Sequence, residues 1–128
     1  MESPVIKRLI GAINTHDLDA MVSNFADDVA CEWPAHPVQS FRGADNVRRN
    51  WAAIFARFPE ISIEVTASAT VGDEFWGEFH YVRPGAADMR GVIVITVRGD
   101  EIVRTRFYME EVDAATSSAH PMPNVARD

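Results

Sequence analysis

The chain has 128 residues, 47% of them hydrophobic and 24% charged, which is the composition of one folded domain. A formal net charge of −7, with acidic residues in both halves, argues against nucleic acid and anionic membranes as partners. The single cysteine, Cys31, excludes an internal disulfide and a thiol-cluster metal site. The N-terminus lacks a secretory signal pattern, and the longest apolar run, residues 92–97, is too short to span a bilayer. We therefore expect a cytoplasmic protein.

Three helices are expected in the first half of the chain. Ser3-Pro4 predicts a helix start, because the missing N–H of proline costs nothing at the first helical position. Asp17 caps a short second helix, which Asp27-Asp28 ends before a short strand over residues 29–33. The third helix ends at Pro59, and its apolar residues recur at helical spacing: Val47, Trp51, Ile54, Phe55 and Phe58.

Beyond Pro59 the hydrophobic period changes from helical to two, which is typical of strands. Four strands joined by short Gly, Asp and Pro turns are expected at residues 61–71, 75–82, 89–97 and 102–109. Such a series forms an antiparallel meander. The polar, Ala-rich residues 113–128 are expected to be a loose tail, so the domain comprises residues 1–112.

Helices followed by long strands predict an α+β fold. A meander of long strands must twist, and the apolar stripes of the helices must cover one face of it. We therefore expect a curved antiparallel sheet, a half-barrel or cone, closed by three N-terminal helices. A pocket at the open end would suit a small ligand.

Short segments along most of the chain resemble the SnoaL-like family of the nuclear transport factor two-like, cone-fold superfamily. The segments that carry the resemblance are residues 12–14, 17–21, 25–29, 41–43, 72–74, 99–102 and 106–110. Together they extend over about residues 5–112. Relatives include polyketide cyclases, steroid isomerases, epoxide hydrolases, dehydratases and proteins that only bind, so the resemblance implies a fold rather than a reaction.

Residues that act in steroid isomerases of this fold do not carry over to this chain. The resemblance places their carboxylate base at Trp33, their tyrosine at Leu9 and their second acid near Ile93. None of these three can play the polar role, so that mechanism is not expected.

Epoxide hydrolases of the fold match at one feature. These enzymes have an acid two residues after a tyrosine on the last strand, and Glu110 follows Tyr108 at the same spacing. Their arginine–aspartate pair falls near Glu78 and His80. Neither of the latter matches in kind.

Four residues are candidates for acid–base catalysis. Glu78 and His80 lie two apart on one strand and share a face with Trp76, while Tyr108 and Glu110 share a face of the last strand. A carboxylate beside an imidazole can act as general base and acid, and Glu78 is the favoured base. Alternatively, the opposite, aromatic face of these strands lines the cone, and the polar set is solvated or lies in a dimer interface.

Large apolar side chains are the expected ligand-binding residues, because aromatic rings bury the most area. They are Trp33, Trp51, Phe55, Phe58, Trp76, Phe107 and Met109. His36 lies in a loop that either covers the mouth of the cone or is simply exposed, and His16 and His120 are expected to face solvent. No metal-ligand spacing such as His-x-His occurs, so neither a metal nor a cofactor is expected.

These observations predict a small-molecule-binding protein. A cofactor-free isomerase, cyclase or dehydratase acting on an apolar polyketide- or terpenoid-like substrate is one form of that prediction, and a non-catalytic dimeric binding or accessory module is the alternative. The small Thr/Ser-rich face of residues 61–71 favours a homodimer through the sheet. A solution mass near 14 kDa by light scattering would contradict the dimer.

Overall fold

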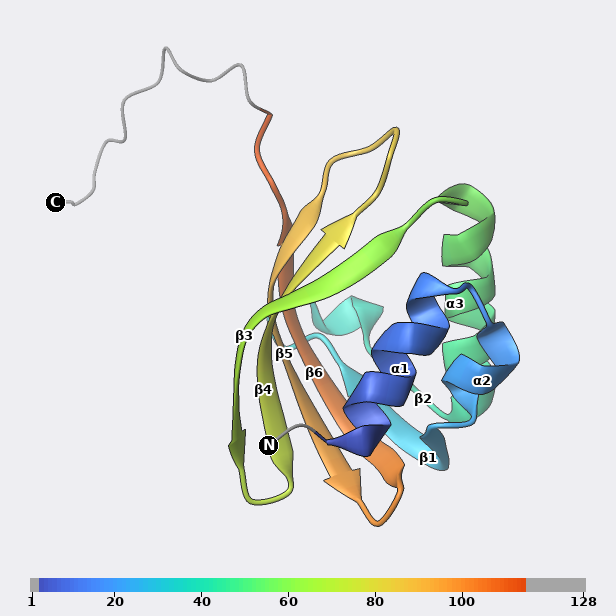
Figure 1. The fold of residues 1–128 in the computed structure, drawn as a ribbon, viewed down its shortest axis with the longest axis vertical. Coiled ribbons are helices and arrows are strands. Elements are labelled where there is room, and N and C mark those ends of the chain that lie inside the picture. Colours follow the sequence, from blue (N-terminus) through green and yellow to red (C-terminus); the bar gives the residue numbers. More distant parts are fainter. Residues whose placement is uncertain (1–2, 115–128) are drawn as a thin grey trace, which may run out of the picture.

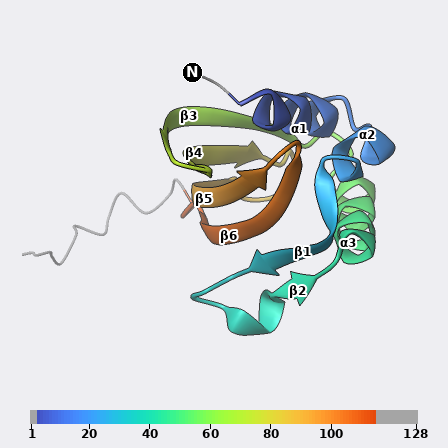
Figure 2. The same ribbon diagram turned by 90° about the horizontal axis from the view of Figure 1, so that it is seen from below.

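The computed structural model describes residues 3–114. Three helices lie against one face of a curved, six-stranded sheet (Figures 1 and 2). The helices are α1 (Pro4–Asn14), α2 (Leu18–Val22) and α3 (Ala44–Arg57), with a 3-10 turn, η1 (Pro37–Gln39). The strands are β1 (Phe25–Glu32), β2 (Phe41–Arg42), β3 (Ser62–Val71), β4 (Glu74–Val82), β5 (Met89–Arg98) and β6 (Glu101–Glu111). The predicted α+β cone fold is confirmed.

The sheet has the order β2-β1-β6-β5-β4-β3. The last four strands form the predicted antiparallel meander. In contrast to the all-antiparallel prediction, β1 pairs with β6 in parallel, with Cys31 opposite Thr105, and the short β2 adds an unexpected sixth strand. The sheet curls around the helices, so α1 packs against β3 while α3 packs against β1 and β2 (Figure 2).

The prediction that Asp27-Asp28 ends the second helix is wrong. Helix α2 stops at Val22, and both aspartates lie within β1, which begins at Phe25. The β1–β6 pairing is irregular between Phe25 and Ala30, and this irregularity leaves both neighbouring carboxylates exposed. Aspartate is uncommon in strands, so two of them in a row hid the start of β1 in the sequence.

Strand β3 also departs from the prediction. Its register shifts between Val65 and Ala67, which is a β-bulge that interrupts the alternation of its faces. Ile63 is buried before the bulge, whereas residues 66–71 are exposed and Val71 retains 66% of its accessible surface. The half-buried strand expected over residues 61–71 is therefore buried only in its first part.

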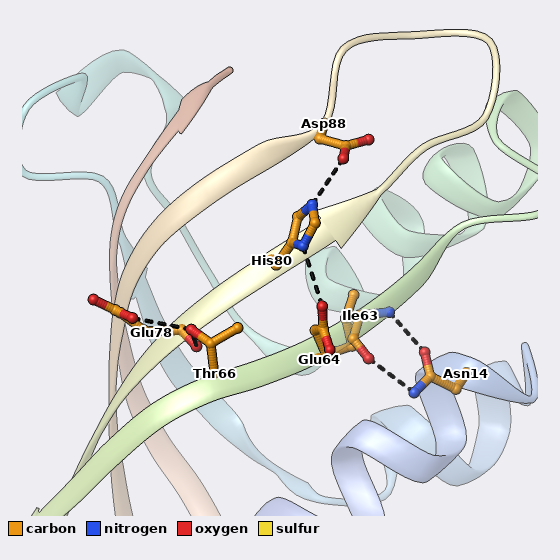
Figure 3. A network of polar contacts seen from close by, with 7 residues as sticks. All are labelled: Asn14, Ile63, Glu64, Thr66, Glu78, His80 and Asp88. Atoms are coloured by element: carbon orange, nitrogen blue, oxygen red, sulfur yellow. Dashed lines mark hydrogen bonds and ion pairs between the residues drawn. The ribbon is translucent and has the colours of Figure 1, made fainter.

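The core lies between the concave face of the sheet and the helices. Fully buried side chains come from both layers: Val5, Met21, Val29, Cys31, Val47, Ile61, Ile95 and Ile102. Asn14, at the end of α1, joins the helix layer to the free edge of β3. Its amide donates to the Ile63 carbonyl at 3.0 Å and accepts from the Ile63 N–H at 2.7 Å (Figure 3).

Within residues 3–114, none of the helices is long and apolar enough to cross a membrane. The loose tail expected over residues 113–128 falls almost entirely outside the described residues, and so does His120.

Candidate functional site

A cavity of about 110 Å³ lies between α3 and the concave face of the sheet. Its walls are largely aromatic: Phe25, Trp33, Phe41, Trp51, Phe58, Tyr81 and Phe107. Cys31, Val47, Ile54, Ile61, Met89 and Met109 add apolar surface. Five of the seven expected ligand-binding residues line this cavity: Trp33, Trp51, Phe58, Phe107 and Met109.

Helical spacing on α3 and alternation on the strands together direct these side chains into the cavity. On α3, Val47, Trp51, Ile54 and Phe58 follow helical spacing and face the sheet. On the strands, alternation turns Tyr81 of β4 and Phe107 and Met109 of β6 towards α3. The same residues therefore form the outer part of the core and the wall of the cavity.

A second, smaller cavity of about 30 Å³ lies deeper in the cone. Both cavities share four wall residues: Phe25, Trp51, Tyr81 and Phe107. The Trp51 ring lies 6.1 Å from the Tyr81 ring, centroid to centroid, at an angle of 55°. These two rings belong to the wall that the cavities have in common.

Outside the main cavity lies an open vestibule of about 380 Å³. The two spaces share Trp33, Met89 and Met109, and the vestibule adds a polar rim of His36, Gln39, Glu110 and Glu111. His36 Nε2 lies 3.0 Å from Glu110 Oε2, and Arg83 Nη2 donates to Glu111 Oε2 at 3.1 Å. The predicted catalytic residue Glu110 thus lies at the mouth, paired with a histidine from the loop after β1.

Polar groups are few within the cavity. Of the described residues, those that line it include no carboxylate and no imidazole; its polar side chains are Asn50, Tyr81 and Arg83. Burial raises the pKa of the Tyr81 hydroxyl, so this group stays protonated and can donate. Burial also raises the pKa of the Cys31 thiol, and the Thr105 hydroxyl only partly offsets that effect. The thiol is therefore a neutral wall group rather than a nucleophile.

Arg83 is held at the edge of the cavity by several contacts. Its side chain is only 11% exposed, and its Nε donates to the Ala87 carbonyl at 2.8 Å. The guanidinium carbon lies 4.8 Å from the centre of the Phe58 ring, a cation–π distance. This arrangement fixes a positive charge beside an apolar space.

The structure places Glu78 and His80 on the outer face of the sheet, opposite the helices, and not in the cavity. His80 Nδ1 lies 3.2 Å from Glu64 and its Nε2 lies 2.7 Å from Asp88, whereas Glu78 accepts a hydrogen bond from Thr66 at 3.0 Å (Figure 3). The hydrogen bond from His80 lowers the pKa of Asp88. The two predicted partners are thus engaged with other residues, and their catalytic role stays an untested prediction.

Carboxylates flank His80 on opposite ring nitrogens, so they cannot converge on one ion. Within the described part of the chain, no group of three His, Cys, Asp or Glu side chains is arranged to hold a metal.

Two expected ligand-binding residues lie elsewhere, which corrects the prediction. Trp76 is on the outer face, 40% exposed and covered in part by Arg106 at 5.6 Å, because its neighbours in the alternation, Phe75 and Gly77, face inwards. Phe55 stacks on His16 at 4.6 Å instead of lining the cavity. His16 itself does not simply face solvent, since its Nε2 lies 2.8 Å from the Ile61 carbonyl oxygen.

The outer face also carries Tyr108, which is 39% exposed and is not among the cavity residues. With Trp76 and Val71 it leaves large apolar groups on the surface. The homodimer through this sheet stays a prediction.

The sequence analysis did not include Phe41, Arg83 and Met89 among the cavity residues, and it did not pair His36 with Glu110. His36 and Glu110 are 74 residues apart, and no spacing rule links such a pair. The signal for Tyr81 was present, because it alternates in phase with Phe75 and Phe79 on the apolar face of β4.

A sequence profile of the SnoaL-like domain matches residues 6–105. The chain belongs to the SnoaL-like family. No functionally curated protein shows significant sequence similarity to it.

Solved structures of other proteins share the fold of this SnoaL-like chain. One is a SnoaL-like protein of unknown function from Burkholderia thailandensis (24% identity, 84% of this chain and 92% of that one, TM-score 0.65). Another, from Catenulispora acidiphila, has a ketosteroid isomerase-like fold and was solved with trimethylamine (19% identity, 84% of this chain and 87% of that one, TM-score 0.69). A third is IdmH of Streptomyces antibioticus, a proposed polyketide cyclase (20% identity, 83% of this chain and 89% of that one, TM-score 0.70). At these identities the likeness establishes the fold alone.

Proposed function

We propose that this protein binds a small, mainly apolar molecule in the cavity beneath α3. The observation that carries the proposal is an aromatic cavity of about 110 Å³ that adjoins an open vestibule through three common wall residues. An engineered apolar cavity of about 150 Å³ is known to take up benzene, so this one is of the size for about one ring. The rest of a larger ligand, such as a polyketide- or terpenoid-like compound, would extend into the vestibule.

Closing the cavity should abolish binding. Ile54 is half-buried on α3 and lines the cavity, so Ile54→Trp is expected to fill it and to weaken binding of indane, a compact bicyclic hydrocarbon, by about tenfold or more. The affinity is measured by titration followed by NMR amide shifts.

Ala53→Trp is the matched control, because Ala53 is exposed on the same helix and does not line the cavity. Its indane affinity should equal that of the unmodified protein. Equal binding by the Ile54→Trp protein, or no binding by the unmodified protein, would refute the proposal.

Acid–base catalysis is a second candidate function, and the His36–Glu110 pair favours it. An ionised carboxylate can only accept, so the ring nitrogen facing Glu110 carries the hydrogen of the 3.0 Å contact. Among the described residues Nδ1 of His36 makes no hydrogen bond, which leaves its lone pair for a proton from a ligand in the vestibule. The carboxylate would orient the ring. A non-catalytic binding module is what remains if this pair does no chemistry.

Proton transfer can be tested with 5-nitrobenzisoxazole, a single fused aromatic unit. A base removes the C3 proton while the ring N–O bond breaks, giving a nitrile and a coloured phenolate. We expect His36→Gln to slow this reaction about tenfold or more and Glu110→Gln to slow it less. Glu78→Gln, on the outer face, is the control and should leave the rate unchanged. A loss of rate in Glu78→Gln alone would instead support the base expected from the sequence.

A further inference from the structure

The cavity has hydrogen-bond donors that lack acceptors. Tyr81 and Trp51 both line it, and Trp51 is only 7% exposed. Among residues 3–114, neither the Tyr81 hydroxyl nor the Trp51 indole N–H makes a hydrogen bond. Neither donor atom is sealed off by protein, so each is open to an acceptor that enters the cavity, and pairing it there would add a net hydrogen bond.

The rest of the lining supplies no strong acceptor to satisfy these groups. Of the described residues that line the cavity, none has a carboxylate or an imidazole. Among these residues the one charged group is the guanidinium of Arg83, which is already paired with Glu111 at 3.1 Å. A ligand or water in the cavity therefore supplies the acceptor, and an apolar wall without a carboxylate disfavours a cation.

We propose that the ligand of this cavity carries a carbonyl-type acceptor oxygen to which the Tyr81 hydroxyl donates. The inference rests on the proposed binding function and adds the chemical class of the ligand: apolar, with an acceptor oxygen and no positive charge. Tyr81 is the anchor rather than Asn50, because the amide of Asn50 is exposed and can bond to water.

Three probes of nearly equal shape separate these properties. Indane is a pure hydrocarbon, 1-indanone adds a carbonyl oxygen, and 1-aminoindane carries a positive charge at neutral pH. The unmodified protein is expected to bind 1-indanone about fivefold more tightly than indane, which is the effect of one net hydrogen bond, and to bind 1-aminoindane most weakly.

Tyr81→Phe removes the hydroxyl and keeps the ring. It should reduce the preference for 1-indanone over indane to about one while leaving the indane affinity unchanged. Tyr108→Phe is the matched control, because it alters the only other tyrosine of the chain, which lies on the outer face. This variant should keep the full preference.

The outcomes separate the two proposals. Equal affinities for indane and 1-indanone, a preference that survives Tyr81→Phe, or tightest binding of 1-aminoindane would overturn the inference and leave the binding function standing. If none of the three probes binds, both proposals fail.

Discussion

Replacing Gly91 by alanine is expected to lower the free energy of unfolding by about 3 kcal/mol or more. Gly91 lies in β5 opposite Phe79 of β4 and Met109 of β6, with φ at +155°. A Cβ atom there would overlap the backbone carbonyl of Tyr108 and lie 2.8 Å from the Met109 Cα. Both obstacles are backbone atoms of the neighbouring strand, so relief requires β5 and β6 to separate.

Urea denaturation followed by circular dichroism measures this loss. Gly72→Ala is the control, since Gly72 also has a positive φ, +60°, but a Cβ there would meet no atom within 4 Å. That variant should lose only about 1 kcal/mol, the cost of the backbone conformation alone. If the two variants lose equal stability, the close approach of the strands is not what requires glycine at position 91.

Replacing Trp51 by alanine is expected to cost about 3–5 kcal/mol, the range for deleting a large buried ring. The Trp51 side chain is also part of the wall that the main and inner cavities have in common. Without it the two spaces should merge into a larger one that binds free indole more tightly than the unmodified cavity does. Added indole would then restore about 1.4 kcal/mol at ten times its dissociation constant.

Thermal unfolding with and without indole tests the second expectation. Trp76→Ala removes the same side chain from the outer face, where it is 40% exposed, and leaves the cavity unchanged, so this control should lose less stability and gain less from indole. Equal stabilisation of both variants by indole would contradict the merged cavity.

Much of the fold could be predicted because alternation and helical spacing report burial directly. Strand β4 appeared where Phe75 and Phe79 alternate with polar residues, and α3 where Trp51 and Phe58 share a stripe. The bulge between Val65 and Ala67 could not be predicted, since one extra residue in a strand leaves no mark in a sequence of small alternating side chains.

The site was harder to predict because both faces of β4 and β6 carry residues that suit a functional site: polar residues on one face and aromatic residues on the other. Glu78 and His80 have the chemistry of an acid–base pair, yet their strand turns them away from α3, and Thr66 and Asp88 engage them instead. Five of the seven expected ligand-binding residues do line the cavity, since the stripe on α3 must face the same side of the sheet, while their role in binding stays a prediction. Residues brought together only by the tertiary fold, such as His36 and Glu110, carry no local signal.

The parallel pairing of β1 with β6 also determines when the domain can finish folding. Residues 30–32 of β1 find their partners at positions 104–106, about 70 residues later in the chain. During synthesis, β1 has only the two-residue β2 beside it until the last strand leaves the ribosome. Contacts so distant in sequence slow folding, because a long loop must close before they contribute. The edge of β1 that pairs with β6 is thus left without its partner strand until residues 104–106 are synthesised.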